Sequence, residues 1–176
     1  MKQTMTIITA VFAMLVLACA AHAQGTGNTT LSLNVPAEAS LTVTTGTTNL
    51  STASTVFGNS FTGATNLTFK LRTAKTGGSG TITAKVSTDF SPANGPSVTT
   101  PPTAGDALTY GCTAAPGTAC TGPITASTVS ATNVATFATN TKTATGTGSV
   151  SWSLTDDPLY ETGTYTATIL FTISAA

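Results

Sequence analysis

Charged residues are scarce in this chain, and histidine is nearly absent. Lysine, arginine, aspartate and glutamate make up 7% of the 176 residues, against about 25% in an average soluble protein, and the formal net charge is zero. Without a basic field, neither nucleic acid nor anionic lipid is expected as a partner. The single histidine, His22, lies in a segment that we expect to be removed. The commonest general base and metal ligand would then be missing, which removes the commonest active-site designs, although carboxylates and lysines could still act. With no catalytic motif elsewhere in the chain, we expect a non-enzymatic protein without a cofactor.

The first 23 residues have the features of a secretory signal peptide. Lys2 supplies a positive start, residues 7–19 are almost unbroken apolar sequence, and residues 21–23 give the small-x-small pattern of a cleavage site. The apolar run is shorter than the roughly 20 residues of a transmembrane helix. We expect a mature protein that begins at Gln24 and is secreted or held at the cell surface. In an alternative interpretation residues 16–19 are a lipobox, and Cys19 carries a lipid anchor.

Cysteine is limited to two positions once residues 1–23 are removed. Cys112 and Cys120 flank a short span that contains Pro116 and Gly117. An oxidising compartment and a turn-rich span favour a disulfide between them.

No amphipathic helix of useful length follows residue 23, whereas threonine makes up about a quarter of the remaining residues. Threonine is β-branched and favours strands. Apolar side chains alternate with polar ones at residues 31–35, 41–43, 67–71, 82–86, 134–137, 150–154 and 165–173. Several short strands between turns predict an all-β fold, an antiparallel β-sandwich formed by one domain over residues 24–176. Residues 89–107 carry four prolines and are expected to form a long exposed loop.

The predicted core is the set of apolar side chains on the inward faces of these strands. Its members are Leu67, Phe69, Leu71, Ile82, Val86, Trp152, Leu154, Tyr165, Ile169, Phe171 and Ile173.

Residues 161–165 resemble the tyrosine corner of immunoglobulin-like sandwiches. In that motif an acidic residue, a glycine and a tyrosine lead into strand F, and the matching positions here are Glu161, Gly163 and Tyr165. The resemblance implies that the last strand here is strand F and that the sandwich lacks its final strand G. A simple turn that contains glycine is the alternative.

Residues 163–173 and 31–43 resemble the two ends of spore-coat-U-like pilins of chaperone–usher systems. The resemblance implies a fimbrial or pilus-type adhesion subunit that lacks strand G, and whose groove is filled by the N-terminal extension of the next subunit. Residues 24–35 would be that extension, with Leu31, Leu33 and Val35 as the strand-donating side chains. The partners that the resemblance implies for the protein are further copies of the same chain or other surface subunits, together with a periplasmic chaperone and an usher. One departure is that the family has a cysteine early in its first strand, where residues 40–42 have none.

Trp152, Ser153 and Leu154 resemble the motif of WxL cell-wall-binding domains. Those domains carry a second such motif, and this chain has one tryptophan. The alternative function is therefore a monomeric extracellular module that binds cell wall or glycan, with Trp152 either in that site or in the core.

Three acidic residues, Asp156, Asp157 and Glu161, cluster near a turn. Their oxygens could bind Ca²⁺, although Asp157 followed by Pro158 is also ordinary turn chemistry. We expect no other metal site and no catalytic residue.

Overall fold

The computed structural model describes residues 27–52 and 54–176. The expected signal peptide, its lipobox alternative at Cys19 and residues 24–26 lie outside this part of the chain. The contacts divide the chain into residues 1–34 and the compact unit of residues 35–176. In the described part, no helix is long and apolar enough to cross a membrane.

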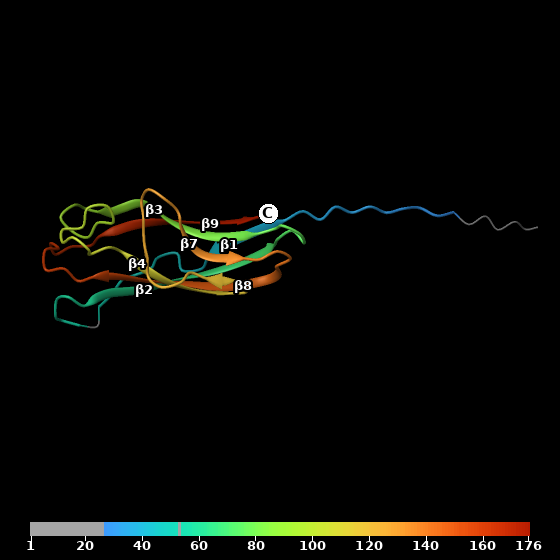
Figure 1. The fold of residues 1–176 in the computed structure, drawn as a ribbon. Coiled ribbons are helices and arrows are strands. Elements are labelled where there is room, and N and C mark those ends of the chain that lie inside the picture. The colour runs from blue at the N-terminus through green and yellow to red at the C-terminus, as the bar shows by residue number, and fades with distance from the viewer. Residues whose placement is uncertain (1–26, 53) are drawn as a thin grey trace, which may run out of the picture. The chain divides into compact units, whose positions relative to one another are not determined.

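Two antiparallel sheets pack face to face, so the predicted all-β sandwich is confirmed (Figure 1). The first sheet has the order β1 (Glu38–Val43), β2 (Ser60–Arg72), β8 (Lys142–Thr155), β4 (Thr109–Ala115) and β6 (Ile124–Thr125). The second has the order β5 (Thr118–Ala119), β7 (Thr132–Phe137), β3 (Gly80–Ser91) and β9 (Thr166–Ala175).

Strict period-two alternation explains the central strands. On β2, Leu67, Phe69 and Leu71 are buried, while the residues between them face outward. A strand turns successive side chains to opposite faces, so a polar–apolar alternation buries one face only. The inward faces of β3 and β8 follow the same rule. Seven of the eleven predicted core residues are buried: Leu67, Phe69, Leu71, Ile82, Val86, Trp152 and Leu154.

The apolar alternation is less regular on β7 than on β2, and the structure shows why. Val134, Ala135 and Phe137 are all buried there, which strict alternation does not allow. The pairing of β7 with β3 shifts register between Ile82 and Thr83, and a β-bulge of this kind turns an extra residue inward.

β4 is a strand that the sequence pattern does not predict. Its central segment of glycine, cysteine and threonine has little apolar character, yet Tyr110 is almost fully buried. The Tyr110 hydroxyl donates to Thr132 Oγ1 at 2.7 Å and to the Asn133 carbonyl at 3.0 Å. The buried ring therefore keeps its polar end satisfied across the two sheets.

Trp152 belongs to the core. Its indole Nε1 donates to Thr65 Oγ1 at 2.9 Å, and its ring lies 5.1 Å from the Tyr110 ring between centroids. With 5% of its surface exposed, the side chain is placed to fill the sandwich rather than to face a ligand.

Candidate functional site

The two long sides of the sandwich are built differently. On one side the Cys112–Cys120 disulfide joins β4 to the residue directly after β5, with Cα atoms 5.4 Å apart, so the predicted bridge is confirmed and ties the two sheets together covalently. On the other side, β1 and β9 lie opposite each other without such a link. We call this second side the β1–β9 edge.

β9 is an edge strand of its sheet. It pairs with β3 from Gly80↔Ala175 to Ser91↔Thr166, and among the described residues no strand pairs with its other side. β1 likewise pairs with β2 alone within this part of the chain. Such edges present rows of backbone N–H and C=O groups that a further strand can bind.

The apolar face of β9 is incompletely covered. Ile169, Phe171 and Ile173 pack against the core but are only half-buried, and Tyr165 is half-buried outside that cluster. Three of these four predicted core residues therefore lie at the margin of the core, and Tyr165 does not belong to it. The cause is their position on an edge strand: Ile82 and Ala84 of the neighbouring β3 are 1–2% exposed because β7 and β9 flank them on both sides.

β1 shows the same partial burial from the other sheet. Ala39 and Leu41 pack against the core while remaining half-buried. The β1–β9 edge thus combines unpaired backbone with apolar side chains that lack full cover.

The three strand-donor candidates are highly exposed. Leu31 is 92% exposed, Leu33 86% and Val35 53%, and residues 27–37 form no strand in the structure. The segment therefore keeps its apolar alternation without burying it.

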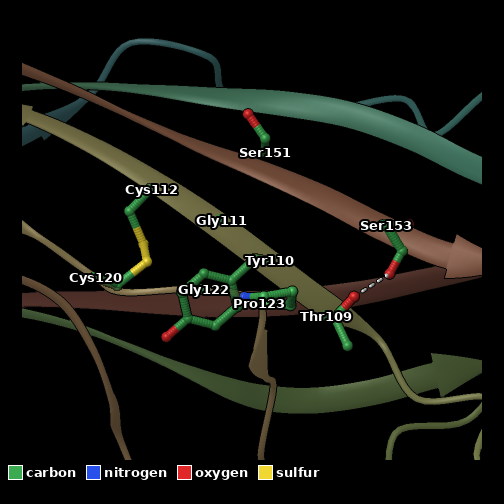
Figure 2. A pocket seen from close by; sticks show the side chains of 9 residues that line it. All are labelled: Thr109, Tyr110, Gly111, Cys112, Cys120, Gly122, Pro123, Ser151 and Ser153. Atoms are coloured by element: carbon green, nitrogen blue, oxygen red, sulfur yellow. Dashed lines mark hydrogen bonds between the residues drawn. A yellow bond between two sulfur atoms is a disulfide. The ribbon is translucent and has the colours of Figure 1, made fainter.

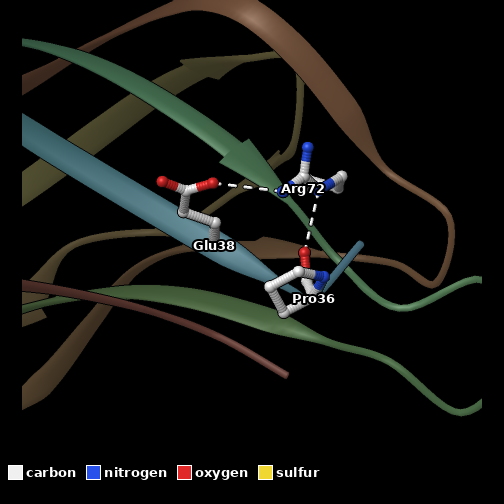
Figure 3. A network of polar contacts seen from close by, with 3 residues as sticks. All are labelled: Pro36, Glu38 and Arg72. Atoms are coloured by element: carbon white, nitrogen blue, oxygen red, sulfur yellow. Dashed lines mark hydrogen bonds and ion pairs between the residues drawn. The ribbon is translucent and has the colours of Figure 1, made fainter. Parts of the chain in front are cut away.

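An arginine holds the chain at the start of the sandwich. Arg72 Nε donates to the Pro36 carbonyl at 2.9 Å, and Arg72 Nη2 lies 3.1 Å from Glu38 Oε2 (Figure 3). An exposed ion pair of this kind stabilises the fold little. Its geometric effect is to fix the backbone one residue after Val35 to the end of β2.

The start of β9 is held by the predicted tyrosine-corner residues. The Tyr165 hydroxyl donates to the Glu161 carbonyl at 2.7 Å and to the Asn94 carbonyl at 3.4 Å. Gly163 lies beside this ring. Gly95 was not among the predicted site residues, yet a Cβ added there would overlap the Tyr165 ring. The sequence Asn94-Gly95-Pro96 could have indicated this position, because it is a strong turn signal.

Asp89 organises the loop that carries Asn94 and Gly95. The expected loop begins later than predicted, because Asp89 still belongs to β3. Its carboxylate accepts five hydrogen bonds, from the backbone of Phe90, Val98 and Thr99 and from the hydroxyls of Ser97 and Thr99. Burial alone would raise the pKa of Asp89, but these hydrogen bonds outweigh it and lower the pKa below its ordinary value of 3.8.

We expect the acid stability of the protein to depend on Asp89. Since its folded-state pKa is lowered, the ionised carboxylate stabilises the fold above the ordinary pKa, and this contribution is lost as the pH falls through the folded pKa. Melting temperatures between about pH 7 and pH 2 should fall less steeply for Asp89→Asn than for the wild type, starting from a lower value at neutral pH. Glu161→Gln, at an exposed position, is the control. Parallel curves for Asp89→Asn and wild type would contradict the assignment.

The calcium candidates do not form a metal site. Among residues 27–52 and 54–176, no group of three or more histidine, cysteine, aspartate or glutamate side chains could hold a metal ion. Asp157 is buried and its Oδ1 accepts from the Leu159 N–H at 2.8 Å, while the backbone N–H of Glu161 donates to the Asn94 carbonyl at 3.0 Å. Asp157 thus helps to shape the turn before β9, which is the role that the alternative interpretation gave to Asp157 followed by Pro158.

A depression of about 450 Å³ lies beside the disulfide on β4 and β8 (Figure 2). It is lined by small and hydroxyl-bearing residues such as Gly111, Ser151 and Ser153, and the Thr109 hydroxyl donates to the Ser153 carbonyl at 3.3 Å. No carboxylate, lysine or histidine of the described residues belongs to its lining. The arrangement brings together no acid, base and nucleophile.

Comparison with known proteins finds no match: no family model, no curated protein and no solved structure is similar to this chain. The β1–β9 edge and the exposed segment of residues 27–35 are therefore interpreted from their own geometry.

Proposed function

We propose that this protein is a non-enzymatic structural subunit of a surface polymer of the pilus or fimbria type, assembled by strand addition. Residues 24–35 of one copy would pair with β9 of another copy. The single observation that carries the proposal is the coexistence, in one chain, of an incompletely covered apolar edge and an exposed apolar strand sequence.

The chemistry of the two parts is complementary. Added beside β9, the segment would satisfy a row of backbone groups and cover Ile169, Phe171 and Ile173 with Leu31, Leu33 and Val35. Fully burying a leucine side chain contributes about 1.5–3 kcal/mol, whereas ordering each residue of the segment costs about 1–2 kcal/mol. Backbone hydrogen bonds and apolar burial are both needed to offset that cost.

Pro36 marks the end of the donated strand. It has no N–H to contribute to a ladder, and its carbonyl is held by Arg72. The donor is thereby separated from the sandwich that follows it. An unpaired edge also exposes the free subunit to aggregation. The resemblance to chaperone–usher pilins implies a periplasmic chaperone and an usher as the partners that would protect and assemble it.

Deletion of residues 24–35 tests the proposal directly. The secreted full-length chain should form polymers on size-exclusion chromatography and in electron micrographs, and the deletion should abolish them. A synthetic peptide of residues 24–35 should then bind the truncated protein and raise its melting temperature.

A matched pair of variants separates the donor face from the rest of the segment. Leu31→Ser with Leu33→Ser removes the apolar face and should abolish polymers, whereas Thr30→Ala with Ser32→Ala alters the opposite face and should leave them. A full-length protein that stays monomeric, with residues 31–35 protected from hydrogen exchange, would show that the segment completes its own sandwich. A monomer retained on peptidoglycan or polysaccharide would favour the binding module.

A further inference from the structure

The charged side chains of residues 35–176 are separated along the strands. Four of the five lysines and arginines in the described residues lie at one end: Lys70, Arg72, Lys75 and Lys142. This is the end where β2 stops and β8 starts, because Arg72 pairs with both Glu38 and Lys142. We call it the cationic end. It also includes the end of β9, since the Ala74 N–H donates to the Ala176 carbonyl at 3.0 Å.

Five of the six acidic residues lie at the opposite end: Asp89, Asp106, Asp156, Asp157 and Glu161. The backbone bonds of Gly58 to Asp156 and of Glu161 to Asn94 connect the loops that carry them, and these loops lie together at the left of Figure 1. We call this the acidic end. No lysine or arginine of the described residues lies there, and Lys85 is halfway along β3.

The negative potential at the acidic end is not neutralised by a cation from the described residues. Burial and the carboxylates of Asp106, Asp157 and Asp156 raise the pKa of Tyr160 to about 12. Within the part of the chain that the structure describes, Asp157 Oδ2 and the Tyr160 hydroxyl are both buried without a hydrogen-bond partner. The positive and negative charges of the chain therefore cancel in number, but they are separated between its two ends.

Both ends also expose apolar surface. Val56, Phe57 and Leu159 are 61–65% exposed in the loops of the acidic end. A depression of about 400 Å³ at the cationic end is lined by the apolar residues Val35, Pro36, Ala37 and Ala74 together with Arg72, Lys75 and Lys142. Protein interfaces likewise combine apolar surface with polar and charged groups.

The charges also select one direction of strand addition. β9 runs from the acidic end at Thr166 to the cationic end at Ala175. A donor strand that runs antiparallel to β9 ends, at Val35, beside the acidic end of the receiving copy. Pro36 follows directly, so the cationic end of the donor copy lies next to that acidic end. A parallel donor would instead bring two cationic ends together, and like charges in contact oppose association.

We propose that the cationic end of one copy docks on the acidic end of the next, which orients the donated strand antiparallel to β9. This inference rests on the proposed strand addition and names the second contact between the copies. Electrostatic complementarity of this kind mainly raises the association rate and is weakened by salt.

Reciprocal charge reversal tests the docking. Lys75→Glu with Lys142→Glu reverses the cationic end, and Asp156→Lys with Glu161→Lys reverses the acidic end. In low salt each variant alone should polymerise at least about tenfold more slowly than the wild type, and an equal mixture of the two should regain the wild-type rate, since each supplies the end that the other needs. Lys85→Glu changes the net charge away from both ends and should leave the rate unchanged.

The peptide of residues 24–35 separates this inference from strand addition itself, because it carries no charged side chain. It should bind deletion versions of the wild type and of both end variants equally. Equal peptide binding with equal polymerisation rates would overturn the docking while strand addition stands. Absence of peptide binding would overturn the proposed function and this inference with it.

Discussion

Replacing Trp152 with alanine is expected to lower the free energy of unfolding by about 3–5 kcal/mol, the range for truncating a large buried aromatic side chain. The variant leaves a cavity beside Tyr110 and Phe171, whose ring centroids lie 5.1 and 6.4 Å from that of Trp152. It also removes the donor to Thr65 Oγ1. Urea denaturation followed by circular dichroism measures the loss.

Two control variants separate burial from polarity. Trp152→Phe keeps most of the apolar contact and should cost less, because Thr65 Oγ1 retains its 2.6 Å hydrogen bond with Thr48. Leu159→Ala changes an exposed apolar residue and should alter stability by less than about 0.5 kcal/mol. An unchanged unfolding midpoint for Trp152→Ala, together with loss of glycan binding, would instead favour the WxL-type function.

Removing the disulfide is expected to have the second largest effect. Cys112 and Cys120 are 8 positions apart, and closing so short a loop stabilises a fold by about 2–3 kcal/mol through the entropy of the unfolded chain. Cys112→Ala with Cys120→Ala should lower the unfolding midpoint accordingly. Protein made in an oxidising compartment should show no free thiol until it is reduced.

The effect should be largest on the side of the sandwich that the bridge closes. Hydrogen exchange should accelerate more at β5 and at its partner residues on β7, such as Ala135, than at β9. Two titratable thiols in the native protein would contradict the bridge. Equal acceleration on both sides would contradict its local role.

Alternation makes the long strands predictable from the sequence. Leu67, Phe69 and Leu71 on β2 and Val150, Trp152 and Leu154 on β8 indicate their inward faces by spacing alone, because a strand has a period of two. β4 was not predicted, because its small residues show no apolar alternation. Its burial depends instead on the packing of Tyr110 between the sheets. The bulge in β7 was equally unpredictable, since it arises from pairing with β3.

The candidate site was only partly accessible from sequence. Leu31, Leu33 and Val35 were identified from spacing, and the Tyr165 hydrogen bond to Glu161 follows from a local motif. The spacing of Ile169, Phe171 and Ile173 is that of a core strand and does not indicate their partial burial. An open groove beside the last strand was expected from the family resemblances alone. Whether such a face is covered depends on strand order in the sheet.

The sequence by itself determined the strand-forming segments, the Cys112–Cys120 pair and the scarcity of charge, because each depends on residue type and short-range spacing. Only the tertiary structure decided that β9 lies at an edge and that Arg72 holds Pro36. It also decided that acids and cations gather at opposite ends, although they are scattered along the chain. The physical reason is that antiparallel pairing brings residues far apart in sequence to the same end of a sheet, and no local pattern encodes that order.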